Sequence, residues 1–378
     1  MKKRVLITGG AGFIGSHTSD LLIQKGYEVY IYDNLNAKTH NGYWPKYLNK
    51  KAKLIFGDVN DRNRLLKAIA KVNYIIHLAA EMDLNPDFKS FMDVNAGGTA
   101  LIYELIVKNK LKIEKVIIAS TQFVYGDGQW QCKFHGRFDA KIRNIELLKE
   151  SKWEICCPQC GNQAEYCKNV ETFHNPPNHY ALSKYFQEKI ALTLGKLYNI
   201  PSVILRYSIV HGSRQSLKNT YSGALRTFAI NLFLNRTLAT FEDNKSLRDF
   251  ISVFDIANAN FVALESKEAV FDIFNVGGDK AWTISDLATI IANRMGKSIK
   301  FSKISEFRLG DIRHAISDNS KMKKLGWYPL YSEEEAITEY LNWFKFQKID
   351  VDTFLKTQKL IRKNKVIQKA KYKRDDNN

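Results

Sequence analysis

A tyrosine and a lysine four positions apart could act together as a general base. Tyr180 and Lys184 lie near the start of an expected helix, 180–197, and residues at this spacing share one helix face. A tyrosine phenol titrates near about 10 in water, so a nearby ammonium is what would favour a phenolate at neutral pH. Such pairs are also common on solvated helices. Thr121 lies just after the end of an expected strand, where a parallel sheet binds its ligands, and this favours the catalytic interpretation.

A glycine-rich turn follows the first expected strand. Residues 8–15 read TGGAGFIG and open an expected helix, where backbone N–H groups and the positive end of the helix dipole bind a pyrophosphate. Asp33 follows directly after the next expected strand, where a carboxylate would accept hydrogen bonds from adenosine ribose hydroxyls. Because a carboxylate disfavours a 2′-phosphate, the pattern predicts NAD rather than NADP.

The five cysteines lie in a single stretch, from position 132 to position 167. Cys132 and His135 form one Cys-x-x-His knuckle, and Cys157 and Cys160 form a Cys-x-x-Cys knuckle, so together they offer four ligands suited to tetrahedral zinc. A site closed by four protein ligands would be structural rather than catalytic. Cys167 could replace His135, and a reduced loop without metal is the alternative.

Composition predicts a globular protein with a sizeable core. The 378 residues are 45% hydrophobic and 12% aromatic, which excludes a disordered or fibrous chain, and no apolar run is long enough to span a membrane. The start superficially resembles a signal peptide, but glycines interrupt its apolar stretch too densely. We expect a soluble, cytoplasmic protein.

The net charge of +18 raises the question of a polyanionic partner. Part of the excess is local, because positions 355–378 hold nine basic and two acidic residues. These basic runs lack the regular aromatic interleaving of a nucleic-acid-binding surface. We therefore expect a solvated, partly disordered tail and no nucleic-acid or membrane contact.

The elements that must position these residues alternate between strands and helices. Strands are expected at 5–8, 28–32, 53–56, 73–78, 115–119 and 201–206, and helices at 13–24, 62–70, 99–108 and 180–197. This alternation predicts an α/β fold with a Rossmann-type, doubly wound parallel sheet. The expected parts are an NAD-binding domain (1–206) with a cysteine-rich insertion (127–177), a small α/β substrate-binding region (207–346) and a basic tail (347–378). The substrate-binding region has expected helices at 221–234, 284–295 and 333–346, and some of its segments could return to the sheet.

Together these motifs resemble the extended short-chain dehydrogenase/reductase family, in particular its nucleotide-sugar epimerases, over about 3–343. The resemblance also rests on Gly57-Asp58-Val59, on the run HLAA at 77–80, on Asn95 and on Arg248-Asp249-Phe250. It implies that Thr121, Tyr180 and Lys184 are catalytic. It implies that NAD contacts Gly9, Gly12, Phe13, Ile14, Gly15, Asp33, Asn34, Asp58, Val59, Leu78, Ala79, Ala80, Asn95, Tyr180 and Lys184.

The resemblance also narrows the range of reactions that we expect the protein to catalyse. Family members that dehydrate their sugar carry an Asp-Glu pair directly after the catalytic threonine, whereas this chain has Gln122-Phe123. We therefore expect epimerisation at C4 through a transient 4-keto sugar. The implied substrate contacts are Thr121, Tyr221, Arg248, Arg308, Asp311 and Arg313, with the arginines binding a diphosphate.

The cysteine insertion and the segment GDIRH at 310–314 are similar to those of epimerases that act on dTDP-L-rhamnose. One departure is Ile209, where the family usually has an asparagine that hydrogen-bonds the substrate. A UDP-hexose 4-epimerase, or another epimerase or reductase of the family, stays open as an alternative. So does a non-catalytic zinc-knuckle protein, although such a protein would not need the catalytic residues. The resemblance also implies a homodimer that packs through 99–108 and 180–197.

Overall fold

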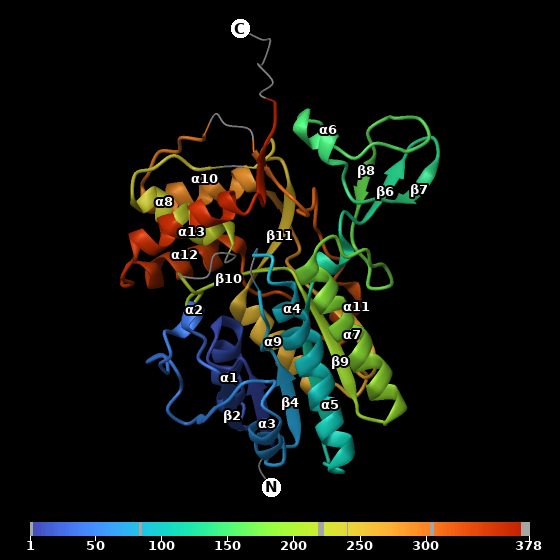
Figure 1. Ribbon diagram of the computed structural model, residues 1–378, viewed down its shortest axis with the longest axis vertical. Coiled ribbons are helices and arrows are strands. Elements are labelled where there is room, and N and C mark those ends of the chain that lie inside the picture. The colour runs from blue at the N-terminus through green and yellow to red at the C-terminus, as the bar shows by residue number, and fades with distance from the viewer. Residues whose placement is uncertain (1–2, 83–84, 218–222, 240, 303–305, 372–378) are drawn as a thin grey trace.

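The structure is a computed structural model that describes residues 3–82, 85–217, 223–239, 241–302 and 306–371. Its centre is a sheet of seven parallel strands in the order β12-β9-β5-β4-β1-β2-β3 (Figure 1). These strands are β1 (Arg4–Thr8), β2 (Glu28–Asp33), β3 (Lys53–Phe56), β4 (Tyr74–His77), β5 (Lys115–Thr121), β9 (Ser202–Tyr207) and β12 (Asp272–Val276). The predicted Rossmann-type fold is confirmed.

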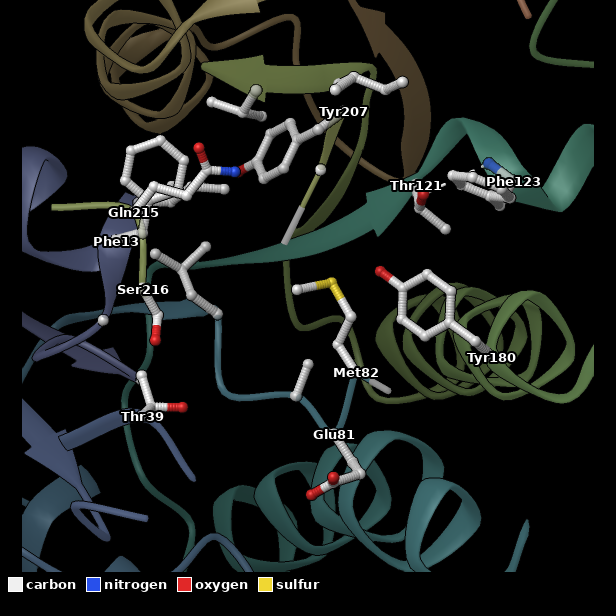
Figure 2. A pocket seen from close by; sticks show the side chains of 18 of the residues that line it. Phe13, Thr39, Glu81, Met82, Thr121, Phe123, Tyr180, Tyr207, Gln215 and Ser216 are labelled. Carbon is white, nitrogen blue, oxygen red and sulfur yellow. Dashed lines mark hydrogen bonds between the residues drawn. The ribbon is translucent and has the colours of Figure 1, made fainter. Parts of the chain in front are cut away.

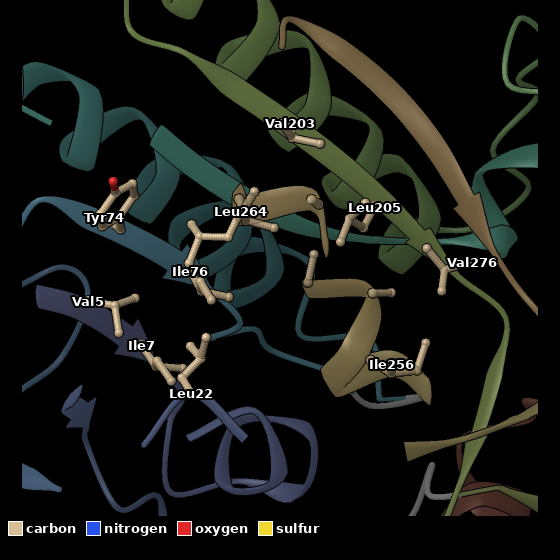
Figure 3. Packing of buried hydrophobic residues seen from close by; sticks show 14 of the residues in the cluster. Val5, Ile7, Leu22, Tyr74, Ile76, Val203, Leu205, Ile256, Leu264 and Val276 are labelled. Carbon is tan, nitrogen blue, oxygen red and sulfur yellow. The ribbon is translucent and has the colours of Figure 1, made fainter. Parts of the chain in front are cut away.

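Helices cover both faces of this sheet. One face packs against α1 (Phe13–Gln24) and α9 (Val253–Glu265), and the other against α3 (Arg62–Ile69), α5 (Gly98–Lys108) and α7 (His179–Leu197). Alternate residues of a strand point to opposite faces, so Val5 and Ile7 join the first core and Leu6 joins the second. Figure 3 shows the first core, where Ile256 of α9 and Leu22 of α1 pack over the strands.

Short elements connect the main ones. They are α2 (Ala37–His40), α4 (Phe88–Phe91), a π-helix (Met92–Gly97), a 3₁₀ helix (Gln122–Tyr125) and α11 (Ser320–Lys324). The cysteine-rich insertion contains a three-stranded sheet in the order β7-β6-β8 and one short helix. Its elements are β6 (Gln129–Cys132), β7 (Gly136–Asp139), α6 (Ile145–Lys149) and β8 (Glu165–Cys167).

The second region lies over the carboxyl ends of the strands (Figure 1). Its helices are α8 (Ala224–Phe233), α10 (Ile284–Met295) and α12 (Glu333–Phe344), and they share one apolar core. Strands β10 (Ile209–His211), β11 (Leu247–Ser252) and β13 (Ala281–Thr283) form a small sheet beside them. After the second region begins, the chain returns to the large sheet through β12, which pairs with β9.

The predicted basic tail needs a correction. Residues 351–363 form α13 (Val351–Lys363), whose Phe354 is buried in the core of the second region. Residues 367–369 form β15 (Ile367–Lys369), which pairs with β14 (Glu306–Arg308) in an antiparallel ladder. The segment folds because it has apolar residues to bury as well as charges. The prediction of a solvated tail was based on its net charge and did not take these apolar residues into account. No helix within the described ranges is long and apolar enough to cross a membrane.

Candidate active site

A cavity of about 830 Å³ opens at the carboxyl ends of the central strands. The predicted cofactor contacts that line it are Gly9, Gly12, Phe13, Ile14, Asp33, Asn34, Asp58, Val59, Leu78, Ala79 and Ala80. Thr121 and Tyr180 lie in the same cavity, as do Arg248, Arg308 and Asp311. The fold therefore gathers residues from both ends of the chain around a single space.

The glycine turn is built for a close approach of backbone to ligand. Gly9 has a φ of +66°, and a Cβ atom added there would lie 2.7 Å from the backbone nitrogen of Ala79. A Cβ atom on Gly15 would lie 2.4 Å from the carbonyl oxygen of Gly9, so Gly15 packs behind the turn rather than lining the cavity. The turn thus leaves backbone at the cavity surface, and this cradle fits a pyrophosphate.

Asp33 lies at the end of β2 with its carboxylate held by the chain. Its oxygens accept hydrogen bonds from the backbone nitrogens of Ala11 (3.1 Å) and Leu35 (2.9 Å). Burial raises the pKa of Asp33, while these bonds oppose the increase. Nearby, the Asn34 amide donates to Asp58 at 2.8 Å, which closes this end of the cavity with polar groups. The arrangement fits an adenosine ribose.

Tyr180 and Thr121 lie together in the cavity, with Met82 and Phe123 beside them (Figure 2). Burial raises the pKa of Tyr180 to about 12, while a hydrogen bond with Thr121 lowers it. Thr121 is held in place because its hydroxyl also accepts from the backbone nitrogen of Phe123 at 3.3 Å. The phenol is thus placed for proton transfer, but its pKa is raised by burial.

Lys184 is buried one turn after Tyr180 on α7 and does not line the cavity. Its ammonium donates to Gln187 Oε1, and Gln187 in turn donates to Thr99 at 2.9 Å. Burial lowers the pKa of Lys184 to about 7, and the carboxylate of Glu188 opposes that shift. The lysine is therefore poised to change its charge near neutral pH.

The predicted substrate contacts divide into two groups. Arg308 lines the cavity, where its guanidinium lies 4.0 Å from the ring centre of Phe241. Arg248 also lines it and is held by the backbone oxygens of Ile312 (2.8 Å) and Arg313 (2.9 Å). Asp311 Oδ1 lies 3.5 Å from Arg248 Nη2. Tyr221 lies outside the described residues.

Arg313 corrects the sequence interpretation, because it does not reach the cavity. It is fully buried and forms ion pairs with Asp243 (2.7 Å), Glu242 (3.0 Å) and Glu154 of the insertion. Three carboxylates compensate its charge, so it joins the insertion to the loop before β11 instead of binding a phosphate.

Asn95 is also set back from the cavity. Its side chain accepts from the backbone nitrogen of Glu81 (2.9 Å) and donates to Ser183 of α7 (2.8 Å). It therefore positions the loop that follows β4 against α7. Sequence reasoning overlooked Asn178, whose amide donates to the carbonyl of Gly310 at 3.0 Å and whose oxygen caps α7. An Asn directly before a helical pattern was the signal for it.

The four predicted metal ligands meet in space. Ligand atoms of Cys132, His135, Cys157 and Cys160 all lie within 4.8 Å of one another. Cys132 Sγ lies 3.7 Å from Cys160 Sγ and 3.6 Å from His135 Nδ1, and Cys157 Sγ lies 3.5 Å from the same nitrogen. Tetrahedral zinc spaces such atoms about 3.5–3.8 Å apart. Cys167 lies outside the cluster.

Comparison with known proteins agrees with this site. Residues 6–136 match the family described as GDP-mannose 4,6 dehydratase, and residues 156–277 match the NAD dependent epimerase/dehydratase family. The dTDP-L-rhamnose 4-epimerase of Burkholderia thailandensis is 31% identical over 360 residues, which are 92% of this chain and 96% of that protein. The chain belongs to the NAD-dependent epimerase/dehydratase family. It is an NAD-dependent nucleotide-sugar epimerase.

Two further relatives show the breadth of the family. A putative UDP-glucose 4-epimerase of Methanocaldococcus jannaschii is 31% identical over 348 residues, which are 90% of this chain and 98% of that protein. The crystal structure of UDP-glucose 4-epimerase from Thermus thermophilus in complex with NAD has a TM-score of 0.73 and 25% identity, and the match covers 91% of this chain and all of that chain.

Proposed function

We propose that this epimerase inverts C4 of a nucleoside-diphosphate sugar, and that its substrate is dTDP-L-rhamnose, which it converts to dTDP-6-deoxy-L-talose. The observation that carries the proposal is that Thr121 and Tyr180 line the same cavity as the glycine turn and a pair of arginines, Arg248 and Arg308. The similarity to the dTDP-L-rhamnose 4-epimerase over nearly the whole chain supports the choice of sugar.

Tyr180 is the base in this scheme. Its phenolate takes the proton of the C4 hydroxyl, and Thr121 orients that hydroxyl by hydrogen bonding. Bound NAD supplies reversible hydride transfer at C4. Tyr180 later returns the proton after the 4-keto sugar has presented its other face. Gln122 and Phe123 follow Thr121 and cannot exchange a proton with C5, so dehydration does not compete.

Arg308 and Arg248 bind the diphosphate in this scheme. Both line the cavity, and the backbone oxygens that hold Arg248 keep its guanidinium fixed. Arg308 lies over Phe241, which restricts its motion. Guanidinium N–H groups suit phosphate oxygens, but both Nη atoms of Arg248 already donate to backbone carbonyls, so Arg248 contributes its positive charge rather than a bidentate contact.

A UDP-hexose is the second candidate substrate. The putative UDP-glucose 4-epimerase matches at the same identity as the rhamnose enzyme. Ile209 lines the cavity where the family usually places an asparagine, so this position supplies no hydrogen bond to either sugar. The two substrates must be separated by experiment.

The test is to incubate the protein with dTDP-L-rhamnose, or with UDP-glucose, and to follow the sugar ring protons by NMR. We expect inversion at C4 of dTDP-L-rhamnose and loss of turnover in Tyr180→Phe with NAD still bound. Tyr185→Phe, on the same helix, is the control and should stay active. If no sugar nucleotide is inverted at C4, the proposal is wrong.

We also propose that Cys132, His135, Cys157 and Cys160 hold a structural zinc ion. The support is the tetrahedral spacing of their ligand atoms. Elemental analysis should find one zinc per chain, none in Cys157→Ser/Cys160→Ser, and an unchanged content in Cys167→Ser. A zinc-free parent protein would refute this assignment.

We also propose that two copies of the chain form a homodimer that packs through α5 and α7. Leu182 and Phe186 lie one turn apart on α7 and are 37% and 44% exposed, so this helix presents an apolar outer face. Light scattering should show a dimer for the parent and a monomer for Phe186→Glu. A dimeric Phe186→Glu would place the interface elsewhere.

A further inference from the structure

The C-terminal segment, defined here as residues 351–371, is joined to the substrate half of the cavity. Strand β15 pairs with β14 in a register that sets Ile367 opposite Arg308. The backbone nitrogen of Leu309 donates to the carbonyl of Val366 at 2.9 Å. The segment is thus hydrogen-bonded to the residues that flank the proposed diphosphate site.

Two apolar side chains of this segment reach the cavity itself. Leu360, near the end of α13, and Ile367, at the start of β15, both line it together with Arg308, Phe241 and Asp311. Leu360 is 43% exposed although it faces a cavity. When a ligand covers an exposed apolar side chain at a cavity wall, the apolar surface is removed from water, and this stabilises the complex.

The C-terminal segment is anchored at three places. On α13, Phe354 is buried, and Arg362 pairs with Glu306 of β14 at 2.8 Å. Across the cavity rim, Asn364 donates to Asn85 at 3.0 Å, which joins it to the loop after β4. At its end, the backbone nitrogen of Lys371 donates to the carbonyl of Lys149 in α6 of the insertion at 2.7 Å. Figure 1 shows the last strand running from the helices of the second region toward α6.

These contacts place the segment at one end of the substrate. Tyr180 and Thr121 mark the reacting sugar carbon, and Arg308 marks the phosphates. Because Ile367 is the register partner of Arg308, it lies near the phosphates, and Leu360 lines the same wall. Aliphatic side chains do not bind phosphate oxygens, but they suit the flat face of a nucleobase or the carbons of a pentose.

We propose that the C-terminal segment forms a wall of the substrate site and that Leu360 and Ile367 contact the nucleoside of the sugar nucleotide. This inference rests on the proposed function for the orientation of the substrate. It assigns a binding role to residues beyond the region of the chain that resembles the family by its motifs.

The test measures the binding of dTDP and of UDP to the full-length protein by calorimetry, without any sugar. We expect Leu360→Ala and Ile367→Ala each to raise the dissociation constant by about 10-fold, the scale of a lost apolar contact in a pocket. Leu330→Ala, an exposed leucine outside the cavity, is the matched control and should bind normally. NAD content should be unchanged in all variants, and the melting temperature should be unchanged in Leu360→Ala and Leu330→Ala, whereas Ile367→Ala should lower it because Ile367 is only 9% exposed.

A second measurement does not depend on substitution. Hydrogen exchange at the amides of residues 351–371 should slow when dTDP is added, and exchange in β7 should stay the same. Parent-like nucleotide affinity in both variants, or no protection of 351–371, would overturn the inference even if C4 inversion is observed. Weaker nucleotide binding without any C4 inversion would instead support the wall and refute the proposed reaction.

Discussion

Replacing Lys184 by methionine should change the pH dependence of the reaction, and not only its rate. Burial lowers the pKa of Lys184 to about 7 and raises the pKa of Tyr180 to about 12. A neutral lysine beside a phenol and an ammonium beside a phenolate carry the same number of protons. Because the two residues lie one turn apart on α7, we expect them to titrate as a pair that loses its first proton near the pKa of about 7 of Lys184.

The sign follows from the proposed role of Tyr180 as a base. The form that accepts a proton from the substrate exists above the first pKa of the pair and disappears below it. Activity should therefore be retained above about pH 7 and lost as the pH falls through about 7. Without Lys184, Tyr180 titrates alone. Because the pKa of Tyr180 is raised, the pH below which activity is lost then lies far in the alkaline range.

The magnitude follows from the raised pKa. A phenol with a pKa of about 12 is ionised in about one molecule in 10⁵ at pH 7. A nearby opposite charge shifts a pKa by about 1–3 units, so the ammonium enriches the phenolate about 10- to 1000-fold. We expect Lys184→Met to lower kcat at pH 7 by about 100-fold, or about 2.7 kcal/mol in the activation free energy.

The assay is kcat as a function of pH, followed by NMR of the converted sugar nucleotide. The parent should level off above neutral pH, whereas Lys184→Met should gain about tenfold per pH unit across the whole range. Lys189→Met, an exposed lysine of the same helix, is the control and should follow the parent. A plateau near neutral pH in Lys184→Met would refute the paired titration.

Three further perturbations test the surroundings of the site. Arg206→Met leaves the buried Glu188 without the partner that lies 2.8 Å away, and should lower the free energy of unfolding by about 3–5 kcal/mol in denaturant titrations; an unchanged midpoint would contradict this. Asp33→Ala removes the acceptor of two backbone N–H groups and the proposed ribose contact, and calorimetry should show at least about tenfold weaker NAD binding. Glu154→Gln weakens an ion pair of the buried Arg313, whose backbone oxygen holds Arg248 at the cavity. It should therefore raise KM for the sugar nucleotide while kcat and zinc content stay the same. A fall in kcat alone would point to another role of Glu154.

The fold was largely predictable because its signals are local. The expected strand 53–56 and the expected helices 13–24 and 284–295 have the same limits in the structure. Each has an apolar pattern of one period and ends at turn or polar residues. The glycine turn was equally clear, since its spacing reflects a steric requirement of the backbone. The three-stranded sheet of the insertion was not predicted, because its strands are short and their pattern is mixed.

By itself, the sequence predicted the parallel sheet, the glycine turn, the candidate catalytic residues and the four-ligand cluster, because each prediction depends on residues close together in the chain or on one repeating period. Only the tertiary structure decided which charged side chains are buried in ion pairs and which face the cavity. Arg313 and Arg308 look alike in sequence, yet Arg313 is compensated by three carboxylates from distant segments while Arg308 faces the cavity. The same holds for the C-terminal segment. Its charges predicted a solvated tail, whereas in the structure its apolar residues pack against the second region and its strand pairs with β14. Burial and ion pairing depend on neighbours that are far apart in the chain, so no local pattern reveals them.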